Sequence, residues 1–319
     1  MREHDFDLFM IGHFAVDRNV VDGRPEVASG GAVYYGAVAA RRLGARVGIA
    51  TRLHPADFGR LDEMRAEGIA VYAVPAPATS GIENIYRSAD MERRTCRPLS
   101  FAGPFQPGDI PLVTTHICAV VPIMAGEVDL PLLRQLALRV AEQASASQAH
   151  RDTACPAGIA LDVQGFVRVR VGDQLLFQPW EEISEGLSYV TYLKVDQAEA
   201  ELLTGETDLA QAARRLAMLG PREIVLTQSS GVTVYAEGEI YRAPFVPRSL
   251  AGRTGRGDTC FAAYLAQRLR MGPAEACRWA AAVTTLKQEQ PGPWRGTLAD
   301  AEALLKKLAA GSSPYLSLA

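Results

Sequence analysis

The chain has 319 residues, of which 48% are hydrophobic and 22% charged, and its formal net charge is −3 at pH 7. This composition is typical of a globular protein with a large core, and the weak net charge argues against a nucleic-acid binder that depends on a basic face. No apolar run reaches the roughly 18 residues of a membrane span, and no signal peptide precedes the first apolar segment, so we expect a cytoplasmic protein.

The cysteines and histidines form no recognisable metal site or disulfide frame. Five cysteines are scattered along the chain without a Cys-x-x-Cys pair, and five histidines are widely spread. We therefore expect reduced thiols and no zinc site.

The first third of the chain alternates between strand and helix patterns. Residues 6–11 form an apolar strand that ends in a turn, and Asp17 follows closely. Gly30 and Gly31 then open an alanine-rich helix that ends at Gly44, and the next strand covers residues 47–50. Strand, glycine turn, helix and strand in this order predict an α/β fold.

Short strands between residues 69 and 99, separated by proline, glycine and charge, predict a small sheet attached to the main body. Farther on, a buried strand at 158–162 ends in Asp162, with Gln164 and Arg168 behind it. Polar residues at the carboxyl ends of parallel strands are favoured binding positions. Asp162 is thus a candidate substrate contact, with a structural turn as the alternative.

The stretch 250–264 is built to hold an anion. Gly252, Gly255 and Gly257 remove the Cβ atoms that would keep a ligand from the backbone, and an apolar helix pattern follows at once. The first N–H groups of that helix would face the loop, with the positive end of the helix dipole. Asp258 lies at the junction. An Asp there could simply cap the helix, but a cap does not need three glycines. Backbone donors beside a carboxylate suit phosphoryl transfer, with the carboxylate taking the proton of the attacking hydroxyl.

Three segments in this order resemble the signatures of the ribokinase (PfkB) carbohydrate kinase family. They are Gly30-Gly31 with Arg42-Leu-Gly44, the Lys194-x-Asp196-x-x-Glu199 segment, and Gly255-Arg-Gly-Asp258. The chain also departs from the family pattern. Gly252-Arg253 replaces an Asp-Thr pair, Arg256 replaces an Ala, Tyr35 and Asp196 each replace an Asn, and Ser229 replaces the first glycine of the nucleotide turn.

The resemblance implies a fold and its organisation. We expect a central, mostly parallel sheet flanked by helices, in one kinase domain over residues 1–319. A small β-sheet lid would come from residues 13–29 and 72–106, and would exclude water that could otherwise accept the phosphoryl group. A free strand edge on this lid could pair with a second subunit to form a homodimer.

The resemblance also implies a set of site residues. Asp258 would be the catalytic base, in an anion hole formed by Gly255, Arg256 and Gly257. The acceptor would meet Asp17, Gly30, Gly31 and Tyr35. The nucleotide would meet Lys194, Asp196, Thr227, Ser229 and Gly231. Glu199 would lie near magnesium, through water.

The favoured function is an ATP- and Mg²⁺-dependent kinase for a hydroxyl of a sugar, nucleoside or cyclitol. The family often holds a monovalent cation near the 290–296 loop. Asp17 favours a neutral acceptor, and Tyr35 in place of an amide disfavours free ribose. A non-catalytic sugar or nucleotide sensor with the same fold is the alternative. A dinucleotide-dependent oxidoreductase is disfavoured, because no Gly-x-Gly-x-x-Gly follows the first strand.

Overall fold

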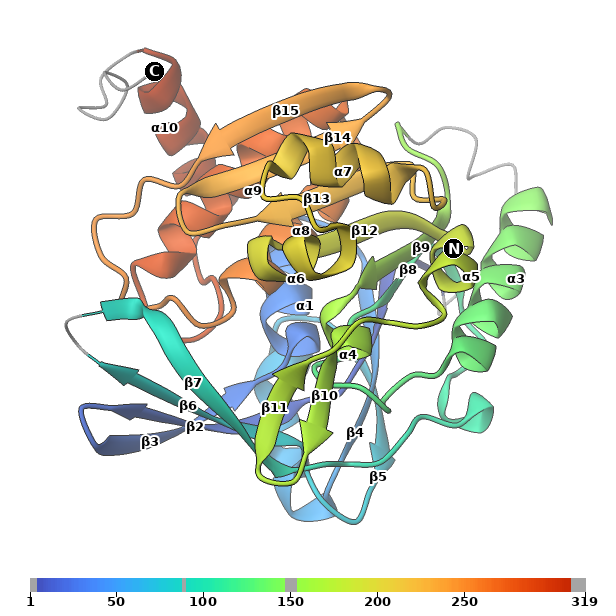
Figure 1. Cartoon of the computed structure of the whole chain (residues 1–319), viewed down its shortest axis with the longest axis vertical. Coiled ribbons are helices and arrows are strands. Elements are labelled where there is room, and N and C mark those ends of the chain that lie inside the picture. The colour runs from blue at the N-terminus through green and yellow to red at the C-terminus, as the bar shows by residue number, and fades with distance from the viewer. Residues whose placement is uncertain (1–4, 88–89, 147–153, 311–319) are drawn as a thin grey trace.

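A nine-stranded sheet forms the centre of the molecule (Figure 1). The computed structural model describes residues 5–87, 90–146 and 154–310. The strand order is β15 (Glu239–Pro244), β14 (Gly231–Ala236), β13 (Glu223–Thr227), β12 (Val190–Asp196), β9 (Gly158–Asp162), β8 (Thr114–Val120), β1 (Asp5–Ile11), β4 (Val47–Leu53) and β5 (Ala70–Pro75). Neighbouring strands are parallel, except that β14 is antiparallel to both β13 and β15. The predicted α/β fold with a mostly parallel sheet is confirmed.

Helices cover both faces of this sheet, because its strands are apolar on both sides. One face carries α1 (Ala32–Arg42), α2 (Asp62–Ala66), α8 (Arg256–Arg268), α9 (Pro273–Gln288) and, packed on α9, α10 (Leu298–Ala309). The other face carries α3 (Leu130–Ala146), α5 (Ile183–Ser188), α6 (Gln197–Thr204) and α7 (Leu209–Ala217). Short helical turns lie at Pro55–Leu61, Pro107–Asp109 and α4 (Gln164–Val167).

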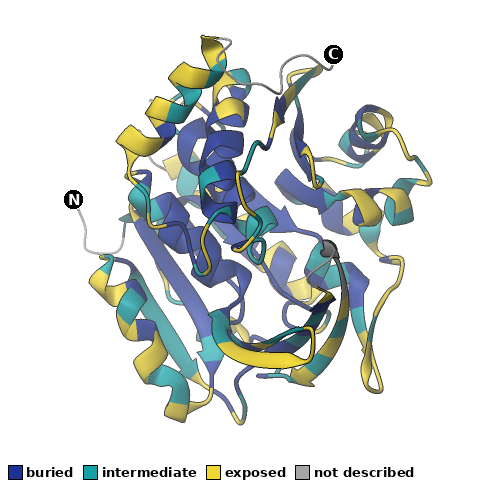
Figure 2. Ribbon diagram, turned by 90° about the vertical axis from the view of Figure 1, so that its left-hand side faces the viewer, coloured by how far each residue is buried: buried dark blue, intermediate teal, exposed yellow. Residues whose placement is uncertain are grey.

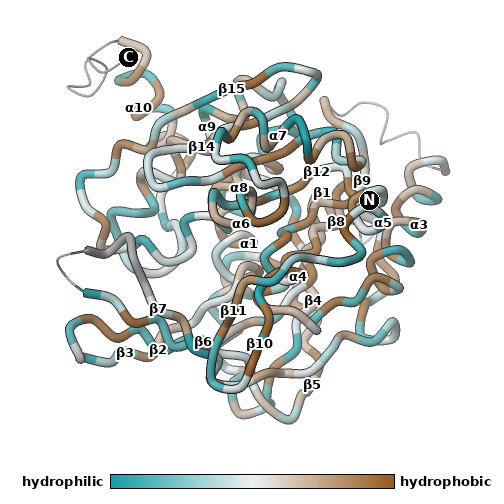
Figure 3. Tube along the Cα trace, in the orientation of Figure 1, coloured by the Kyte–Doolittle hydropathy of each residue, from teal (hydrophilic) through white to brown (hydrophobic). Residues whose placement is uncertain are grey.

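Burial follows from this layering. Figure 2 shows buried strands and inner helices beneath outer helices with a solvent-exposed face, and Figure 3 shows hydrophobic residues concentrated in the central strands. In α8 every residue from Thr259 to Arg268 is buried. Small residues allow this, since a Cβ at Gly36 of α1 would lie 3.2 Å from the Cβ of Ala262 in α8. Helix α8 is thereby packed closely against α1.

A second sheet of four strands forms the lid. Its order is β3 (Arg24–Gly30), β2 (Ala15–Val21), β6 (Gly81–Arg87) and β7 (Asp90–Ser100), with β2 and β6 parallel and the other pairs antiparallel. A hairpin of β10 (Arg168–Val171) and β11 (Gln174–Phe177) packs against β7, and no sequence pattern predicted it. Val27 on the edge strand β3 is 59% exposed. The proposed pairing of two subunits through this edge stays a prediction.

The lid segment expected at 72–106 is too long at both ends. Strand β5 pairs with β4 in the large sheet, so residues 72–75 belong to the main body. The lid strands of this segment end at Ser100. The short strand-like run at residues 71–74 predicted a strand correctly, but such a run does not say which sheet the strand joins.

Two further observations concern the cysteines and the possibility of a membrane-spanning helix. All five cysteines carry free thiols. Among the described residues, no helix combines the length and the apolar character that crossing a lipid bilayer requires.

Candidate active site

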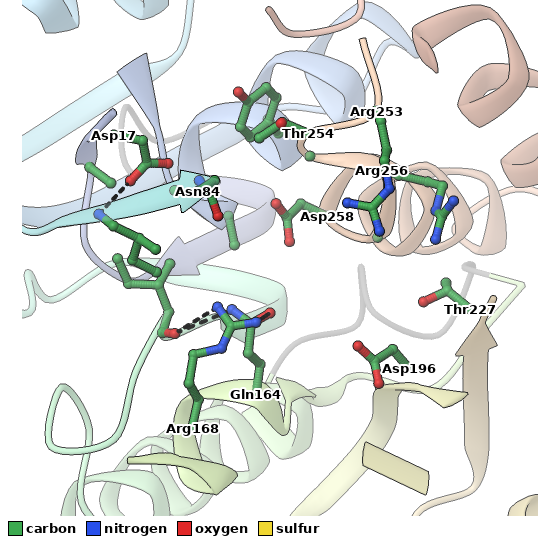
Figure 4. A pocket seen from close by; sticks show the side chains of 18 of the residues that line it. Asp17, Asn84, Gln164, Arg168, Asp196, Thr227, Arg253, Thr254, Arg256 and Asp258 are labelled. Atoms are coloured by element: carbon green, nitrogen blue, oxygen red, sulfur yellow. Dashed lines mark hydrogen bonds between the residues drawn. The ribbon is translucent and has the colours of Figure 1, made fainter. Parts of the chain in front are cut away.

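Helix α8 begins at the glycine loop. Gly255 is its N-cap residue, with a left-handed φ of 81°, and no side chain caps the helix. The Arg256 N–H donates to the Arg253 carbonyl at 3.1 Å. The next N–H groups, those of Gly257 and Asp258, have no acceptor within the helix and can bind a ligand, and the helix dipole favours negative charge there. Asp258, in the first turn, points into a cavity that Gly255, Arg256 and Gly257 also line (Figure 4). The predicted base and the predicted anion hole thus share one cavity wall.

Polar side chains line this cavity on two sides of Asp258 (Figure 4). One group, here named the lid end, consists of Asp17, Asn84, Gln164 and Arg168. The other, here named the sheet end, consists of Lys194, Asp196, Thr227, Arg253 and Arg256. The sheet end lies where β12 and β13 finish, because the carboxyl ends of parallel strands meet at one edge.

Asp17 reaches the cavity from the lid strand β2. Its Oδ1 accepts a hydrogen bond from the backbone N–H of Ile82, at 2.9 Å, and the side chain is buried. A Cβ at Gly30 would lie 2.3 Å from Asp17 Oδ2, so Gly30 makes room for this carboxylate and is not itself among the lining residues. Gly31 does line the cavity, with φ of 92°. A Cβ there would meet the carbonyl oxygen of His13 at 2.4 Å.

Three lid-end residues, Asn84, Gln164 and Arg168, were not predicted from the sequence to be site residues. Asn84 lies on β6 and donates to Asn19 Oδ1 at 3.2 Å. Arg168 is 6% exposed and donates to Gln164 Oε1 at 2.8 Å and to the carbonyl of Ile123 at 3.5 Å. The sequence feature that could have identified Gln164 and Arg168 is their position just after a strand that ends in an acid. No sequence feature pointed to Asn84. Its strand joins the site only through lid pairing.

Tyr35 also lines the cavity. Its side chain is 4% exposed and its hydroxyl donates to the carbonyl of Ser29 at 3.4 Å. Burial raises the pKa of Tyr35 well above its usual value, and the charges of Asp17 and Asp258 raise it further. Tyr35 therefore offers the cavity a neutral phenol and an aromatic face.

Lys194 brings a buried positive charge to the sheet end. Its Nζ donates to both carboxylate oxygens of Asp162, each at 3.0 Å, and lies 3.9 Å from Glu199 Oε2. Burial alone would lower the pKa of Lys194, but Asp162 and Glu199 outweigh it and raise the pKa above the usual value. Asp162 is not among the lining residues. The structure therefore places Asp162 against Lys194, and Lys194 against the cavity.

Asp196 and Glu199 form the capping box of α6. Asp196 Oδ1 accepts from the Glu199 N–H at 2.8 Å, and Glu199 Oε2 accepts from the Asp196 N–H at 2.7 Å. Burial raises the pKa of Glu199 to about 8, although Lys194 lowers it. Glu199 Oε1 is buried without a hydrogen-bond partner, which fits the predicted contact through water.

The described residues contain no group of three or more acids, histidines or cysteines that could hold a metal ion. Mg²⁺ often binds through one or two carboxylates, water and substrate phosphates, and this chain fits such a site. Asp196 lines the cavity and would face the ion, with Glu199 behind it.

The predicted nucleotide contacts on β13 and its turn separate in space. Thr227, the last residue of β13, is buried and lines the cavity. Ser229 is exposed in the turn that follows, and Gly231 lies buried at the start of β14, where a Cβ would meet the carbonyl of Ala243 at 2.5 Å. Neither residue is among those that line the cavity.

Comparison with known proteins identifies the family. A pyrophosphate-dependent kinase in the ribokinase family, solved as a sulfate complex, is 36% identical; the match covers 93% of this chain and 99% of that one, with a TM-score of 0.82. This chain belongs to the ribokinase family. The model of the pfkB family carbohydrate kinases matches residues 152–297 of the kinase. It follows that the kinase is a phosphotransferase with an alcohol group as acceptor.

Two further relatives differ in what they act on. A pyrophosphate-dependent kinase in the ribokinase family, solved with a pyrophosphate analog and myo-inositol, is 35% identical to this kinase over 93% of this chain and 99% of that one, with a TM-score of 0.81. Cytidine kinase from Thermococcus kodakarensis is 26% identical over 283 residues, covering 85% of this chain and 91% of that protein.

Proposed function

We propose that this kinase transfers a phosphoryl group from pyrophosphate to a hydroxyl of a cyclitol, with myo-inositol as the first candidate. The main support for pyrophosphate as the donor is the set of residues that form the sheet end. Its side chains are charged or carry a hydroxyl, and the adjoining wall is made of Thr254 and glycines. A compact polyanion suits these side chains, whereas a purine would need an apolar slot.

The cations of the sheet end support the same donor. Lys194, Arg253 and Arg256 lie beside the start of α8, and guanidinium groups bind phosphate oxygens in a forked geometry. Two arginines occupy positions that are uncharged in the usual family signature. Two relatives above 30% identity are described as pyrophosphate-dependent. ATP, which the family signature predicted, is the second candidate donor.

The lid end supports a polyhydroxylated acceptor. Asp17 accepts hydrogen bonds, Arg168 donates them, and Asn84 and Gln164 do both, which matches hydroxyls that donate and accept. A cyclitol carries hydroxyls around its whole ring and a ring face that can lie on Tyr35. One relative was solved with myo-inositol bound. Asp17 disfavours an acceptor with a phosphate beside it.

The proposed mechanism gives each residue one task. Asp258 takes the proton of the attacking hydroxyl, whose oxygen bonds to the transferred phosphorus while the bond from that phosphorus to the bridging oxygen breaks and inorganic phosphate leaves. The N–H groups at the start of α8 and the Arg256 guanidinium stabilise the charge on the moving phosphoryl group. Lys194 binds donor oxygens, and Asp162 holds Lys194 in place. Bound Mg²⁺ would neutralise charge on the donor oxygens. The lid strands exclude water.

The experiment pairs two donors with several acceptors. Purified protein is incubated with pyrophosphate or ATP and with myo-inositol, cytidine, ribose or fructose, and the phosphorylated product is measured by ³¹P NMR. We expect the highest kcat/KM for pyrophosphate with myo-inositol. A higher kcat/KM with ATP would overturn the donor, and one with ribose or cytidine would overturn the acceptor. Binding without turnover of any pair would support the sensor alternative.

A variant tests whether Arg256 acts on the donor. Arg256→Ala should lower kcat/KM for the donor and steepen its dependence on magnesium, while the acceptor KM stays unchanged. Arg214→Ala, on the exposed side of α7, is the matched control. Unaltered kinetics across a magnesium titration would show that Arg256 does not act on the donor.

A further inference from the structure

Lys287 is a buried lysine at the end of α9, next to the anion-hole loop. Only 2% of its surface is exposed. Its Nζ donates to the backbone carbonyls of Gly252 and Thr254, the two residues that flank Arg253 just before α8. Within the described part of the chain, no carboxylate forms an ion pair with it at 4 Å or less. Its hydrogen-bond acceptors are thus backbone carbonyls, with no paired carboxylate.

The groups around Lys287 Nζ are of the kind that bind a monovalent metal cation. Backbone carbonyl oxygens are typical ligands of K⁺, and the Tyr35 ring adds a cation–π contact, with its centroid 4.9 Å from Lys287 Nζ. Burying an ammonium without a carboxylate is costly. Burial lowers the pKa of Lys287 to about 7, while the charge of Asp258 raises it. A costly charge at this place indicates a functional use.

The carbonyl contacts constrain the anion hole itself. In a planar trans peptide the C=O and the following N–H point in opposite directions. Fixing the Thr254 carbonyl on Lys287 therefore fixes the direction of the Gly255 N–H. On the same side, the Gly252 N–H donates to the carbonyl of Gln288 at 2.8 Å. The end of α9 thus holds the loop 252–254 by both its donors and its acceptors.

We propose that Lys287 is a positioning residue of the anion hole, whose ammonium takes the seat that a free monovalent cation would otherwise fill. Phosphoryl transfer by this kinase then needs no added K⁺ or Na⁺, in contrast to the cation that the family resemblance led us to expect near residues 290–296. The proposal rests on the kinase activity of the family and is independent of which donor and acceptor are used.

The first test needs no variant. Turnover is measured with the donor–acceptor pair that works best, and binding of magnesium pyrophosphate and magnesium ATP is measured by calorimetry. Both are repeated in potassium, sodium and choline chloride at equal ionic strength. We expect the wild type to be unaffected by the choice of cation. A requirement for K⁺ or Na⁺ in the wild type would overturn the proposal.

The second test removes the ammonium. Lys287 also lines a second cavity of about 260 Å³, together with Leu286, Gln290 and Trp294, so small solutes can approach the lysine from this cavity. Lys287→Ala in choline chloride should lose about tenfold or more in donor affinity or turnover, the effect of losing one charged hydrogen-bonding group. Ammonium, methylammonium or K⁺ should restore part of this loss.

Two controls separate positioning from folding. Lys306→Ala on α10 removes an exposed lysine and should show neither loss nor rescue. Thermal unfolding in each salt shows whether Lys287→Ala is folded, and Lys287→Met, which keeps the volume, replaces it if it is not. An equal loss for Lys287→Ala in all salts, with no rescue by any cation, would contradict a cation seat. If pyrophosphate is not the donor, the wild-type protein will show a higher kcat/KM with ATP. That result is independent of the cation tests on Lys287→Ala.

Discussion

The ring of Tyr35 lies directly against the backbone of Gly255, so that a Cβ at position 255 would fall 2.3 Å from the ring's Cγ atom. Tyr35 comes from α1 and Gly255 is the N-cap of α8, and the two helices pack together behind the cavity. Tyr35 is a predicted acceptor contact and Gly255 is part of the predicted anion hole, so their contact links these two parts of the cavity. A change at either residue should therefore affect both.

Gly255→Ala tests this contact. The new Cβ would collide with Tyr35, and alanine would be strained at a φ of 81°. We expect a loss of about 1–3 kcal/mol in the free energy of unfolding and a large loss of kcat. Gly205→Ala, at the end of α6, has a similar φ of 71° with nothing within 4 Å, and should keep normal turnover. Equal kinetics for the two variants would argue against the contact.

Asp258→Asn tests the proposed base. The amide keeps the shape of the side chain but cannot accept the proton of the hydroxyl. Turnover should fall by about 10²–10⁴-fold, while calorimetric binding of the donor survives. A folded Asp258→Asn protein with near-normal kcat would rule out this role.

Arg168→Ala tests the lid end. Removing a charged donor from a buried site should weaken acceptor binding by about 1.5–3 kcal/mol, or roughly 10–100-fold in KM. The donor KM should not change. Arg170→Ala is the control on the same strand, because Arg170 is exposed and stacks on Phe101, 3.7 Å from the ring centroid. An unchanged acceptor KM for Arg168→Ala would place the acceptor elsewhere.

Asp162→Ala tests the support of Lys194. The substitution leaves a buried ammonium with only the Glu199 carboxyl 3.9 Å away. We expect a loss of about 3–5 kcal/mol in the free energy of unfolding, as is usual when one partner of a buried ion pair is removed. Urea unfolding measures it. Asp162→Asn keeps one hydrogen-bond acceptor and should therefore lose less free energy of unfolding than Asp162→Ala. A larger loss for Asp162→Asn would contradict the pairing of Asp162 with Lys194.

Glu127→Gln tests a buried carboxyl below the lid. Glu127 accepts N–H bonds from His13, Ile123 and Met124 at 3.0, 2.7 and 3.0 Å, and burial raises its pKa from 4.5 to about 8. Between these values the folded protein binds a proton that the unfolded chain has lost. Glu127 therefore contributes a fall in the free energy of unfolding as pH rises through this window, whereas the adjacent His13, whose pKa burial lowers to about 3, contributes a rise in its lower part. In urea unfolding, Glu127→Gln should show a weaker fall, and parallel curves for both proteins would show that Glu127 is ionised when folded.

Local patterns were enough for much of the fold. The glycine pair before residue 32 and the glycines before residue 256 each marked the start of a helix, because a helix start is set by nearby residues. The lid boundary at residue 72 was wrong because the choice between two sheets depends on long-range pairing. For the same reason the hairpin of β10 and β11 was not foreseen.

The sequence by itself determined that an acid follows an anion-binding glycine loop at the start of a helix, since loop, acid and helix are contiguous. Only the tertiary structure decided what surrounds that acid. Asn84 enters the cavity through strand pairing in the lid, and Asp162 turns to Lys194 from a neighbouring strand. Lys287 reaches the loop from 35 residues away, where a lysine in a helix looks like any solvent-exposed cation. Burial and hydrogen-bond partners arise only when distant segments pack together, so spacing along the chain does not encode them locally.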